Sequence, residues 1–281
     1  MLEKIIYKNS MNETLSFGQD KLFVNKNDLH DYKWNVTSKN NRISGFDRGV
    51  TTKTLPVVIM CDSEEEGIEI RNKLFEVCEK DILFEKHGRI IIGDYYMKCY
   101  INGSKKSEYL KSKRYMTVTL TLTTDLPYWI KETTTAFGYG DATTYAAGGV
   151  SNGKNLDYNN DFPYDYASTL LDKKLNNNNF VPSNHIMRIF GACENPKIIV
   201  GGHDYEVKKR LEANEYLTID SIDKTVLLTH ADGSTENCFN LRNKDSYIFE
   251  KIPVGNINVS SNGDFKFDII LLEERSEPKW T

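Results

Sequence analysis

Residues 115–123 read YMTVTLTLT, so that apolar residues alternate with threonine along the whole stretch. Successive side chains of a β-strand point to opposite faces, and this alternation therefore predicts a half-buried strand with its aliphatic side chains against a core. Two shorter apolar runs, LPVVIM at 55–60 and RIIIG at 89–93, are also typical of strands. The N-terminal part of the chain is therefore predicted to be rich in β-structure.

One helix is predicted between these strands. Ser63 is followed by Glu66 at the spacing of a capping box, in which each side chain accepts a hydrogen bond from the other residue's backbone N–H. The acidic residues 64–66 suit the positive end of the helix dipole. Beyond them, four apolar residues recur at helical spacing and predict one buried face: Ile70, Leu74, Val77 and Cys78. The helix is expected to run from Ser63 to about Asp81.

The composition changes after residue 132. Residues 133–184 are rich in Gly, Asn, Thr, Tyr and Asp and poor in aliphatic residues, which is typical of linkers and surface loops. From residue 185 onward, short strand-like segments return, separated by turn dipeptides such as Asp232-Gly233 and Asn262-Gly263. The sequence thus predicts a mainly β protein with one notable helix. We expect an α+β N-terminal domain over 1–132, a loop-rich linker or extension over 133–184 and a C-terminal β-sandwich over 185–281.

The bulk composition argues against several classes of partner. The net charge is -4 and the pI is about 5.8, whereas a nucleic-acid binder generally carries a basic excess that neutralises phosphates. No run approaches the ~20 apolar residues of a transmembrane helix, so no membrane insertion is expected. The five cysteines are widely spaced and include no C-x-x-C motif. Free thiols in a reducing cytoplasm are therefore predicted, without zinc or a disulfide framework.

Two glycine-rich motifs resemble catalytic loops but lack the required context. Gly148 and Gly153-Lys154 have phosphate-loop spacing, yet Asn155 stands where a magnesium-binding Ser or Thr is needed. Ser151 lies in a Gly-x-Ser-x-Gly pattern, but no strand-to-helix turn is predicted there to expose it as a nucleophile. We predict no cofactor and no catalytic serine in this segment.

Other candidate sites are equally incomplete. Asp157, Asn159 and Asp161 start like a calcium loop, but the positions that require Gly and Glu hold Phe162 and Ser168. Glu273 and Glu274 are adjacent, so that in a strand they face opposite ways and suit neither glycosidase geometry. The histidines form no metal-binding pattern. The sequence therefore predicts no catalytic, cofactor-binding or metal-binding residues and a protein that is not an enzyme.

Tyrosines are frequent in the central segment. They could stack on sugars, or they could pack loops and interfaces, where tyrosine adds contact area at low entropic cost. The second interpretation is the more common one for such residues. They are Tyr139, Tyr145, Tyr158, Tyr164 and Tyr166.

Beyond these patterns, the order and spacing of short segments resemble the distal tail protein (Dit) family of siphovirus-type phage tails. The N-terminal segments are Arg48-Gly49, Leu55-Pro56, Arg71–Leu74, Asp81-Ile82, Gly88–Ile90, Tyr95–Tyr100, Met116–Thr123 and Asp125–Trp129. The C-terminal segments are FPYDY (162–166), FGACENPKI (190–198), LTID (217–220), IPVG (252–255) and EERSEPKW (273–280). The resemblance covers nearly the whole chain and rests on order rather than on any single motif.

This resemblance implies a structural virion protein of the phage tail tip, or of a tail-like particle, assembled in the cytoplasm of a host bacterium. It implies a ring, usually a homohexamer, built by the N-terminal domain. The ring would join the tail tube protein to the tail-tip hub or tail-associated protein of the baseplate. The C-terminal sandwich would be galectin-like and face outward, offering receptor-binding proteins a platform for host attachment. The chain has no room for the carbohydrate-binding modules inserted in some relatives.

The alternative is a carbohydrate-binding adhesin module of the tail tip, in which the β-sandwich holds glycans. The sequence leaves open whether the tail is contractile and whether the particle is a phage or a tail-derived bacteriocin. It also leaves open which adhesion proteins dock.

Overall fold

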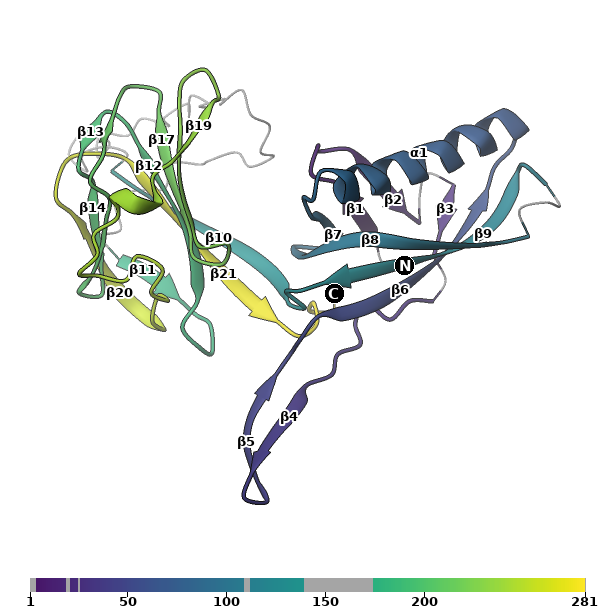
Figure 1. Ribbon diagram of the computed structural model, residues 1–281, viewed down its shortest axis with the longest axis horizontal. Helices are drawn as coiled ribbons and strands as arrows, with labels where there is room; N and C mark the ends of the chain where they lie inside the picture. The colour runs from purple at the N-terminus through teal and green to yellow at the C-terminus, as the bar shows by residue number, and fades with distance from the viewer. Residues whose placement is uncertain (1–3, 19–20, 25, 109–111, 139–173, 281) are drawn as a thin grey trace, which may run out of the picture. The chain divides into compact units, whose positions relative to one another are not determined.

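The computed structural model of the chain describes residues 4–18, 21–24, 26–108, 112–138 and 174–280. They belong to two compact units (Figure 1), each described here by itself. Unit 1 comprises Met1–Lys131 and Glu274–Thr281, and unit 2 comprises Glu132–Glu273. The chain passes from unit 1 to unit 2 along one strand, and it returns along another.

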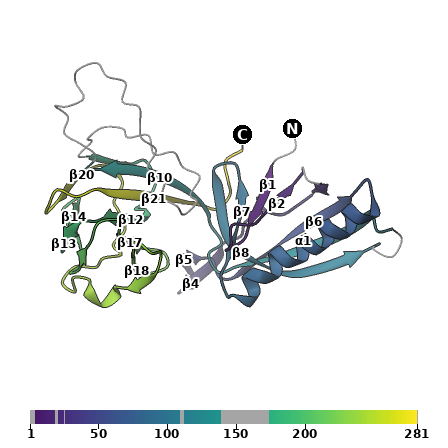
Figure 2. The ribbon, with the colours of Figure 1, turned by 90° about the horizontal axis from the view of Figure 1, so that it is seen from above.

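Unit 1 consists of antiparallel strands and one α-helix (Figure 2). Its elements are β1 (Ile5–Lys8), β2 (Thr14–Phe17), β3 (Leu22–Phe23), β4 (Asn35–Lys39), β5 (Arg42–Asp47), β6 (Thr51–Met60), α1 (Glu64–Leu83), β7 (Gly88–Ile92), β8 (Tyr95–Ser107) and β9 (Tyr115–Thr124). β8 has three partners: Tyr95–Cys99 pair with β7, Tyr96 also pairs with Ile130 of β10 (Trp129–Phe137), and Tyr100–Ser107 pair with β9. Two runs of strands therefore share β8, in the orders β2-β1-β7-β8 and β8-β9-β6-β3.

The pairing of β6 with β9 is the longest continuous register in unit 1. It runs without interruption from Thr51 opposite Thr124 to Met60 opposite Tyr115. The alternating aliphatic side chains of both strands are buried, as the pattern at 115–123 predicts: Leu55, Val57, Ile59, Met116, Val118, Leu120 and Leu122. The threonines occupy the opposite face. The predicted half-buried strand is thus confirmed.

The predicted helix is present as α1, which packs against β8, β2 and β6. Leu74, Val77 and Cys78 are buried, and Ile70 packs on the same core. The Ser63 side chain accepts a hydrogen bond from the Glu66 backbone N–H at 3.1 Å. The return bond differs from the predicted capping box, since Glu66 accepts from the Asp62 N–H rather than that of Ser63. The helix also ends two residues later than expected, at Leu83.

A buried carboxylate joins α1 to the first two strands. Asp81 is fully buried, and its Oδ2 accepts a hydrogen bond from the Tyr7 hydroxyl at 2.5 Å. Its Oδ1 accepts from the Ser10 backbone N–H at 2.8 Å. Burial raises the pKa of Tyr7 above its ordinary value, and the bond to Asp81 adds to this effect. Gly88 leaves room for the pair, because a Cβ there would lie 2.4 Å from Asp81 Oδ2.

Unit 2 is a β-sandwich, as predicted. Its elements are β10 (Trp129–Phe137), which enters from unit 1, β11 (Lys174–Asn177), β12 (Asn184–Phe190), β13 (Cys193–Glu194), β14 (Lys197–Val200), β15 (His203–Glu206), β16 (Arg210–Leu211), β17 (Tyr216–Asp220), β18 (Thr225–Thr229), β19 (Thr235–Asn237), η1 (Phe239–Leu241), β20 (Gly255–Ser261) and β21 (Phe267–Arg275). One sheet has the order β19-β18-β17-β12-β21-β10, and the other β11-β20-β14-β15. Side chains from both sheets share one core that includes Ile189, Ile269, Ile198 and Val259.

The structure differs from the predicted segmentation in three places. Residues 133–137, expected to be linker, complete strand β10, and residues 174–177 form β11. The polar composition of both segments gives no strand pattern in the sequence, because only part of each strand faces a core. Residues 274–281 belong to unit 1 rather than to the sandwich, with Trp280 stacked on His30 at a centroid distance of 4.1 Å.

All five cysteines are free thiols, and Cys61, Cys78, Cys99 and Cys238 are buried. Among the described residues no helix has the length and apolarity needed to cross a membrane.

The Tyr7–Asp81 bond yields a stability prediction for unit 1. Tyr7→Phe leaves the buried Asp81 Oδ2 without its hydroxyl donor, and a lost buried partner costs about 1–3 kcal/mol. We expect the free energy of unfolding in urea to fall by that amount. Tyr100→Phe is the matched control, because its hydroxyl donates to the Glu85 carbonyl at an exposed site. Equal effects of the two substitutions would contradict a structural role for the buried pair.

His185 yields a pH prediction for unit 2. It is fully buried on β12, and burial lowers its pKa from 6.5 to about 3, with small contributions from Lys224 and His203. The His185 imidazole of the unfolded chain is therefore protonated below about pH 6.5, whereas in the folded chain it stays neutral down to about pH 3. Stability is intact above pH 6.5 and is lost as the pH falls through this window, by about 1.4 kcal/mol per unit at most.

The measurement is urea unfolding at pH 7, 6, 5 and 4. His185→Leu is expected to flatten the loss of stability relative to the unsubstituted chain. His230→Asn is expected to steepen it, because Glu215 raises the pKa of the half-buried His230, whose protonation favours the folded state. An unchanged pH profile in His185→Leu would exclude the buried imidazole as the cause.

Candidate assembly interface

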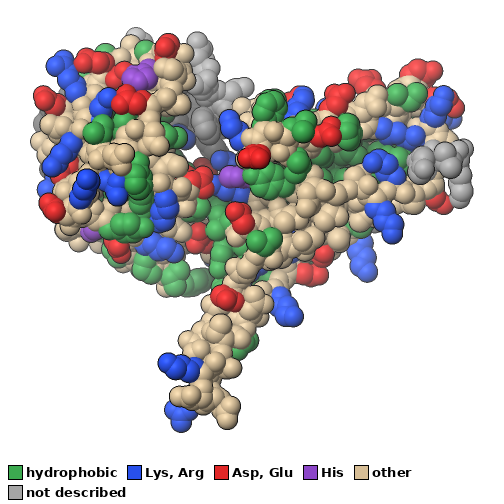
Figure 3. Space-filling view, viewed as in Figure 1, with side chains coloured by type: hydrophobic (Ala, Val, Ile, Leu, Met, Phe, Trp, Pro, Cys, Tyr) green, Lys and Arg blue, Asp and Glu red, His purple; other side chains and the backbone are tan. Residues whose placement is uncertain are grey.

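The hairpin of β4 and β5 is the least covered structure in unit 1. Among the described strands, β4 and β5 pair only with each other. Gly45 is half-buried, and the other residues of both strands are exposed. Figure 3 shows the hairpin projecting into solvent, with basic side chains at its tip. A lone two-stranded hairpin is marginally stable in water, so its stability must come from contacts beyond its own hydrogen bonds.

The register gives this hairpin one apolar face. Val36 lies opposite Phe46, and Ser38 lies opposite Ile43, with a bulge between the two pairs. Because Val36 and Ser38 are two residues apart, Val36, Ile43 and Phe46 all project from the same side. Their exposed fractions are 56%, 64% and 59%. The opposite face carries Thr37 against Gly45, where a Cβ would lie 3.0 Å from the threonine hydroxyl.

Arg48 holds the base of the hairpin. Its guanidinium carbon lies 5.4 Å from the ring centroid of Trp34 and 5.0 Å from that of Tyr128. These two rings are in edge-to-face contact with each other. Partial burial lowers the pKa of Arg48, and its Nε and Nη1 have no hydrogen-bond partner in the described part of the chain. Cation–π attraction to two rings therefore orients the residue.

The loop before the hairpin is also fixed. The Lys53 ammonium is buried and donates to the Asp28 carbonyl at 2.8 Å and to the Asp31 carbonyl. The Trp129 indole N–H donates to the Leu29 carbonyl at 3.3 Å in the core. The base of the hairpin is thus held to the rest of unit 1 by side-chain contacts, which suits a surface that binds in one orientation.

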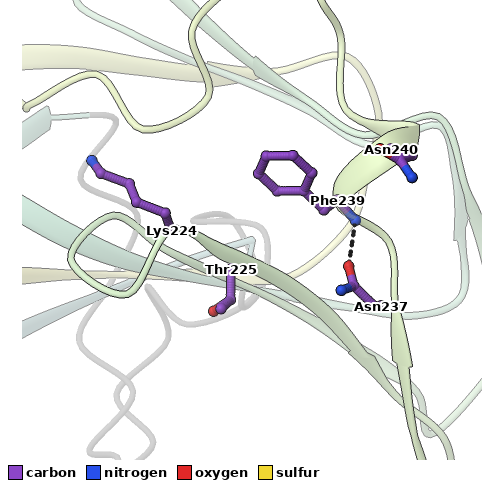
Figure 4. Close-up of a pocket in the computed structure, with 5 residues that line it drawn as sticks. All are labelled: Lys224, Thr225, Asn237, Phe239 and Asn240. Carbon is purple, nitrogen blue, oxygen red and sulfur yellow. Dashed lines mark hydrogen bonds between the residues drawn. The ribbon is translucent and has the colours of Figure 1, made fainter.

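Unit 2 carries a surface hollow of about 480 Å³, drawn in Figure 4. It is lined by Lys224, Thr225, Asn237, Phe239 and Asn240. The Phe239 ring is already engaged by the protein, since Phe249 stacks on it at 6.0 Å and a guanidinium lies 3.8 Å from its centroid. The hollow offers amide and ammonium groups to a polar ligand, without a free aromatic platform.

Most of the candidate catalytic and binding motifs of the sequence fall on residues that the structure does not describe. Gly148–Asn155, Asp157–Asp161 and the five central tyrosines all lie outside those residues. Glu273 and Glu274 are adjacent on β21, as expected. No group of three His, Cys, Asp or Glu residues suited to a metal occurs in the described part of the chain.

Sequence reasoning missed the hairpin, although a signal was present. Asn40-Asn41 separates VTSK from RISGF, and both asparagines have positive φ, 52° and 58°. Asparagine tolerates this conformation, and two-residue hairpin turns require it. The signal is weaker than Asn-Gly, and no alternating apolar pattern accompanies it.

Together, the described residues define a class of fold: two β-rich units, with one α-helix in the described part of the chain, a projecting hairpin and a C-terminal sandwich. Similar solved structures come from phage particles. The Dit (gp 19.1) protein of phage SPP1, described as a paradigm of the hub adsorption apparatus in phages that infect Gram-positive bacteria, matches with a TM-score of 0.54 and 9% identity. The match covers 98% of this chain and all of that one.

Chains of the phage P2 baseplate in its activated conformation match with TM-scores of 0.64 in both the Ca and Sr forms. Their identities are 14% and 13%, and each match covers 99% of this chain and all of the other. No protein-family model and no curated protein matches the sequence. The chain therefore has the Dit-type fold over nearly its whole length, which confirms the resemblance that the sequence indicated.

Arg48→Ala tests the hairpin base. Loss of the cation–π contacts costs about 0.5–1 kcal/mol. It is therefore expected to raise the population of molecules in which the hairpin has detached from its base about two- to fivefold. Tryptic cleavage after Lys39 and Arg42 should accelerate by the same factor under native conditions. Arg89→Ala is the control, since its guanidinium lies 4.4 Å from the Tyr96 ring in the same unit. Acceleration in both variants would show general destabilisation rather than a specific anchor.

Proposed function

We propose that this protein is a structural subunit of a phage-type tail tip. It forms a ring, a homohexamer, that joins the tail tube to the hub and adhesion apparatus. The observation that carries the proposal is the fold shared, over nearly the full length, with the SPP1 hub protein and the P2 baseplate chain. The projecting hairpin supports it, because a β-element held at its base and otherwise uncovered suits subunit assembly.

The proposed partners are other copies of this chain, the tail tube protein, and the tail-tip hub or tail-associated protein. Unit 1 builds the ring. Unit 2, which the proposal treats as galectin-like, offers a platform for receptor-binding proteins. In support, Phe180 and Val181 lie exposed before β12, and Val254 lies exposed before β20. Apolar side chains on a surface are typical of protein contacts when they gather. The proposal includes no catalysis, no nucleic-acid partner and no membrane insertion.

The alternative is a carbohydrate-binding adhesin module. The polar hollow beside Phe239 is the one described feature that favours it. A glycan array on the purified chain separates the two functions. Specific sugar binding that is lost in Asn237→Ala, by a protein that stays monomeric, would support the adhesin.

The ring is tested on the full-length chain by light scattering and electron microscopy across protein concentrations, with and without tube protein. We expect a closed oligomer of six copies, favoured by salt, because screening weakens repulsion between subunits of net charge -4. A monomer under every one of these conditions would refute the structural ring and promote the adhesin.

A further inference from the structure

One side of α1 carries an apolar stripe that does not pack on the core of unit 1. Ile68, Phe75 and Ile82 are exposed by 42%, 54% and 41%. They are seven residues apart, a spacing that keeps side chains on one side of a helix with only a slow drift. Leu83 and Phe84 at the C-terminal end of the helix are also exposed. The stripe borders the buried face of the helix, because Phe75 lies three residues before the buried Cys78 and Ile82 lies four residues after it.

The stripe lies in an acidic setting. Glu65, Glu69, Glu76 and Glu79 are exposed on α1 along one side of it, whereas Lys73 is the one exposed basic residue of the helix. Figure 3 shows acidic, basic and apolar side chains intermingled over this part of unit 1. A partner for this face should therefore present apolar side chains flanked by positive charge.

We propose that the α1 stripe of one copy receives the apolar face of the β4–β5 hairpin of a second copy. The hairpin offers Val36, Ile43 and Phe46 on one face, with Lys39 and Arg42 paired at its tip. Apolar groups thus meet apolar groups, and the basic tip meets the acidic helix. The inference rests on the proposed ring and names the contact that closes it.

The partner must be a second copy, because a chain cannot make this contact with itself. Figure 1 shows the hairpin extending from the start of β6 away from the sheet, on the side opposite α1. The two surfaces also differ, so the contact is heterologous and repeats from copy to copy.

The dimensions of the two surfaces agree. From Ile68 to Ile82 the helix rises about 21 Å at 1.5 Å per residue. A five-residue strand such as β4 spans about 17 Å. The hairpin therefore covers most of the stripe when it lies along the helix. Each contact is small beside the ~1,200–2,000 Å² of a standard interface, so that assembly through it is concentration-dependent and gains from ring closure.

Charge reversal on the full-length chain tests the pairing. Lys39→Glu with Arg42→Glu, or Glu76→Lys with Glu79→Lys, is expected to raise the concentration for half-assembly at least about tenfold, because like charges oppose each other at the contact. All four substitutions together restore opposite charges and should return the value to within about threefold of the original. Lys244→Glu with Lys251→Glu, at exposed sites of unit 2, is the matched control and should leave assembly unchanged.

Cross-linking supplies an independent readout. Chains with Ile43→Cys are mixed with chains with Phe75→Cys and treated with a short bismaleimide. A covalent dimer is expected only in the mixture, and Glu250→Cys in place of Phe75→Cys should give background levels. The unsubstituted chain controls for the half-buried Cys193.

The outcomes separate this contact from the ring itself. A closed oligomer that forms normally despite the charge reversals, without the Ile43–Phe75 cross-link, would overturn the hairpin–helix contact and leave the proposed ring standing. Absence of any oligomer, with or without tube protein, would overturn both. Loss of assembly in each pair, rescue in the fourfold variant and the specific cross-link would establish the contact.

Discussion

Unit 1 depends on the continuity of β8, which pairs with β7 and β10 near its start and with β9 along the rest of its length. Tyr95–Cys99 pair with β7, and the strand then pairs with β9 after a bulge between Ile101 and Gly103. The change of partner requires a close approach at the bulge, where a Cβ on Gly103 would lie 2.9 Å from the Thr121 side chain. This strand thereby carries the β1–β2 hairpin on one side and the long β6–β9 pair on the other, and α1 packs on the joined surface.

The parts of the fold that the sequence predicts are those whose pattern is local and whose burial is complete in one chain. β9 alternates because one face meets a core, and α1 shows its capping residues and its buried face within a few turns. Strands β10 and β11 escape prediction because their polar residues face solvent for part of their length. The return of Trp280 to stack on His30 could not be predicted, since it depends on where the chain re-enters unit 1.

The candidate interface escapes prediction for a related reason. Sequence periodicity records which side chains leave water, and the hairpin buries almost nothing within its own chain. Val36, Ile43 and Phe46 share a face only because the bulge between Thr37 and Ser38 resets the alternation. On α1, the exposed Ile68 and Phe75 are interspersed among the buried positions, so that the helix appears apolar on more than one side. Apolar residues that do not contribute to the core of the monomer are therefore the sequence feature by which an assembly contact can be recognised.

If copies of the chain join through the proposed contact, a closed ring is favoured over a pair or a filament. Each copy has one hairpin and one stripe, and an open chain of copies always leaves one of each in water at its ends. A two-fold dimer would satisfy both only if hairpin and stripe faced each other reciprocally, whereas they extend to opposite sides of unit 1 (Figure 1). Closure removes both ends at once and adds a contact without adding a subunit, so the last contact costs little translational entropy. In the proposed ring, the hairpin base formed by Arg48, Trp34 and Tyr128 would fix the angle between successive copies, and that angle would set how many copies complete the ring.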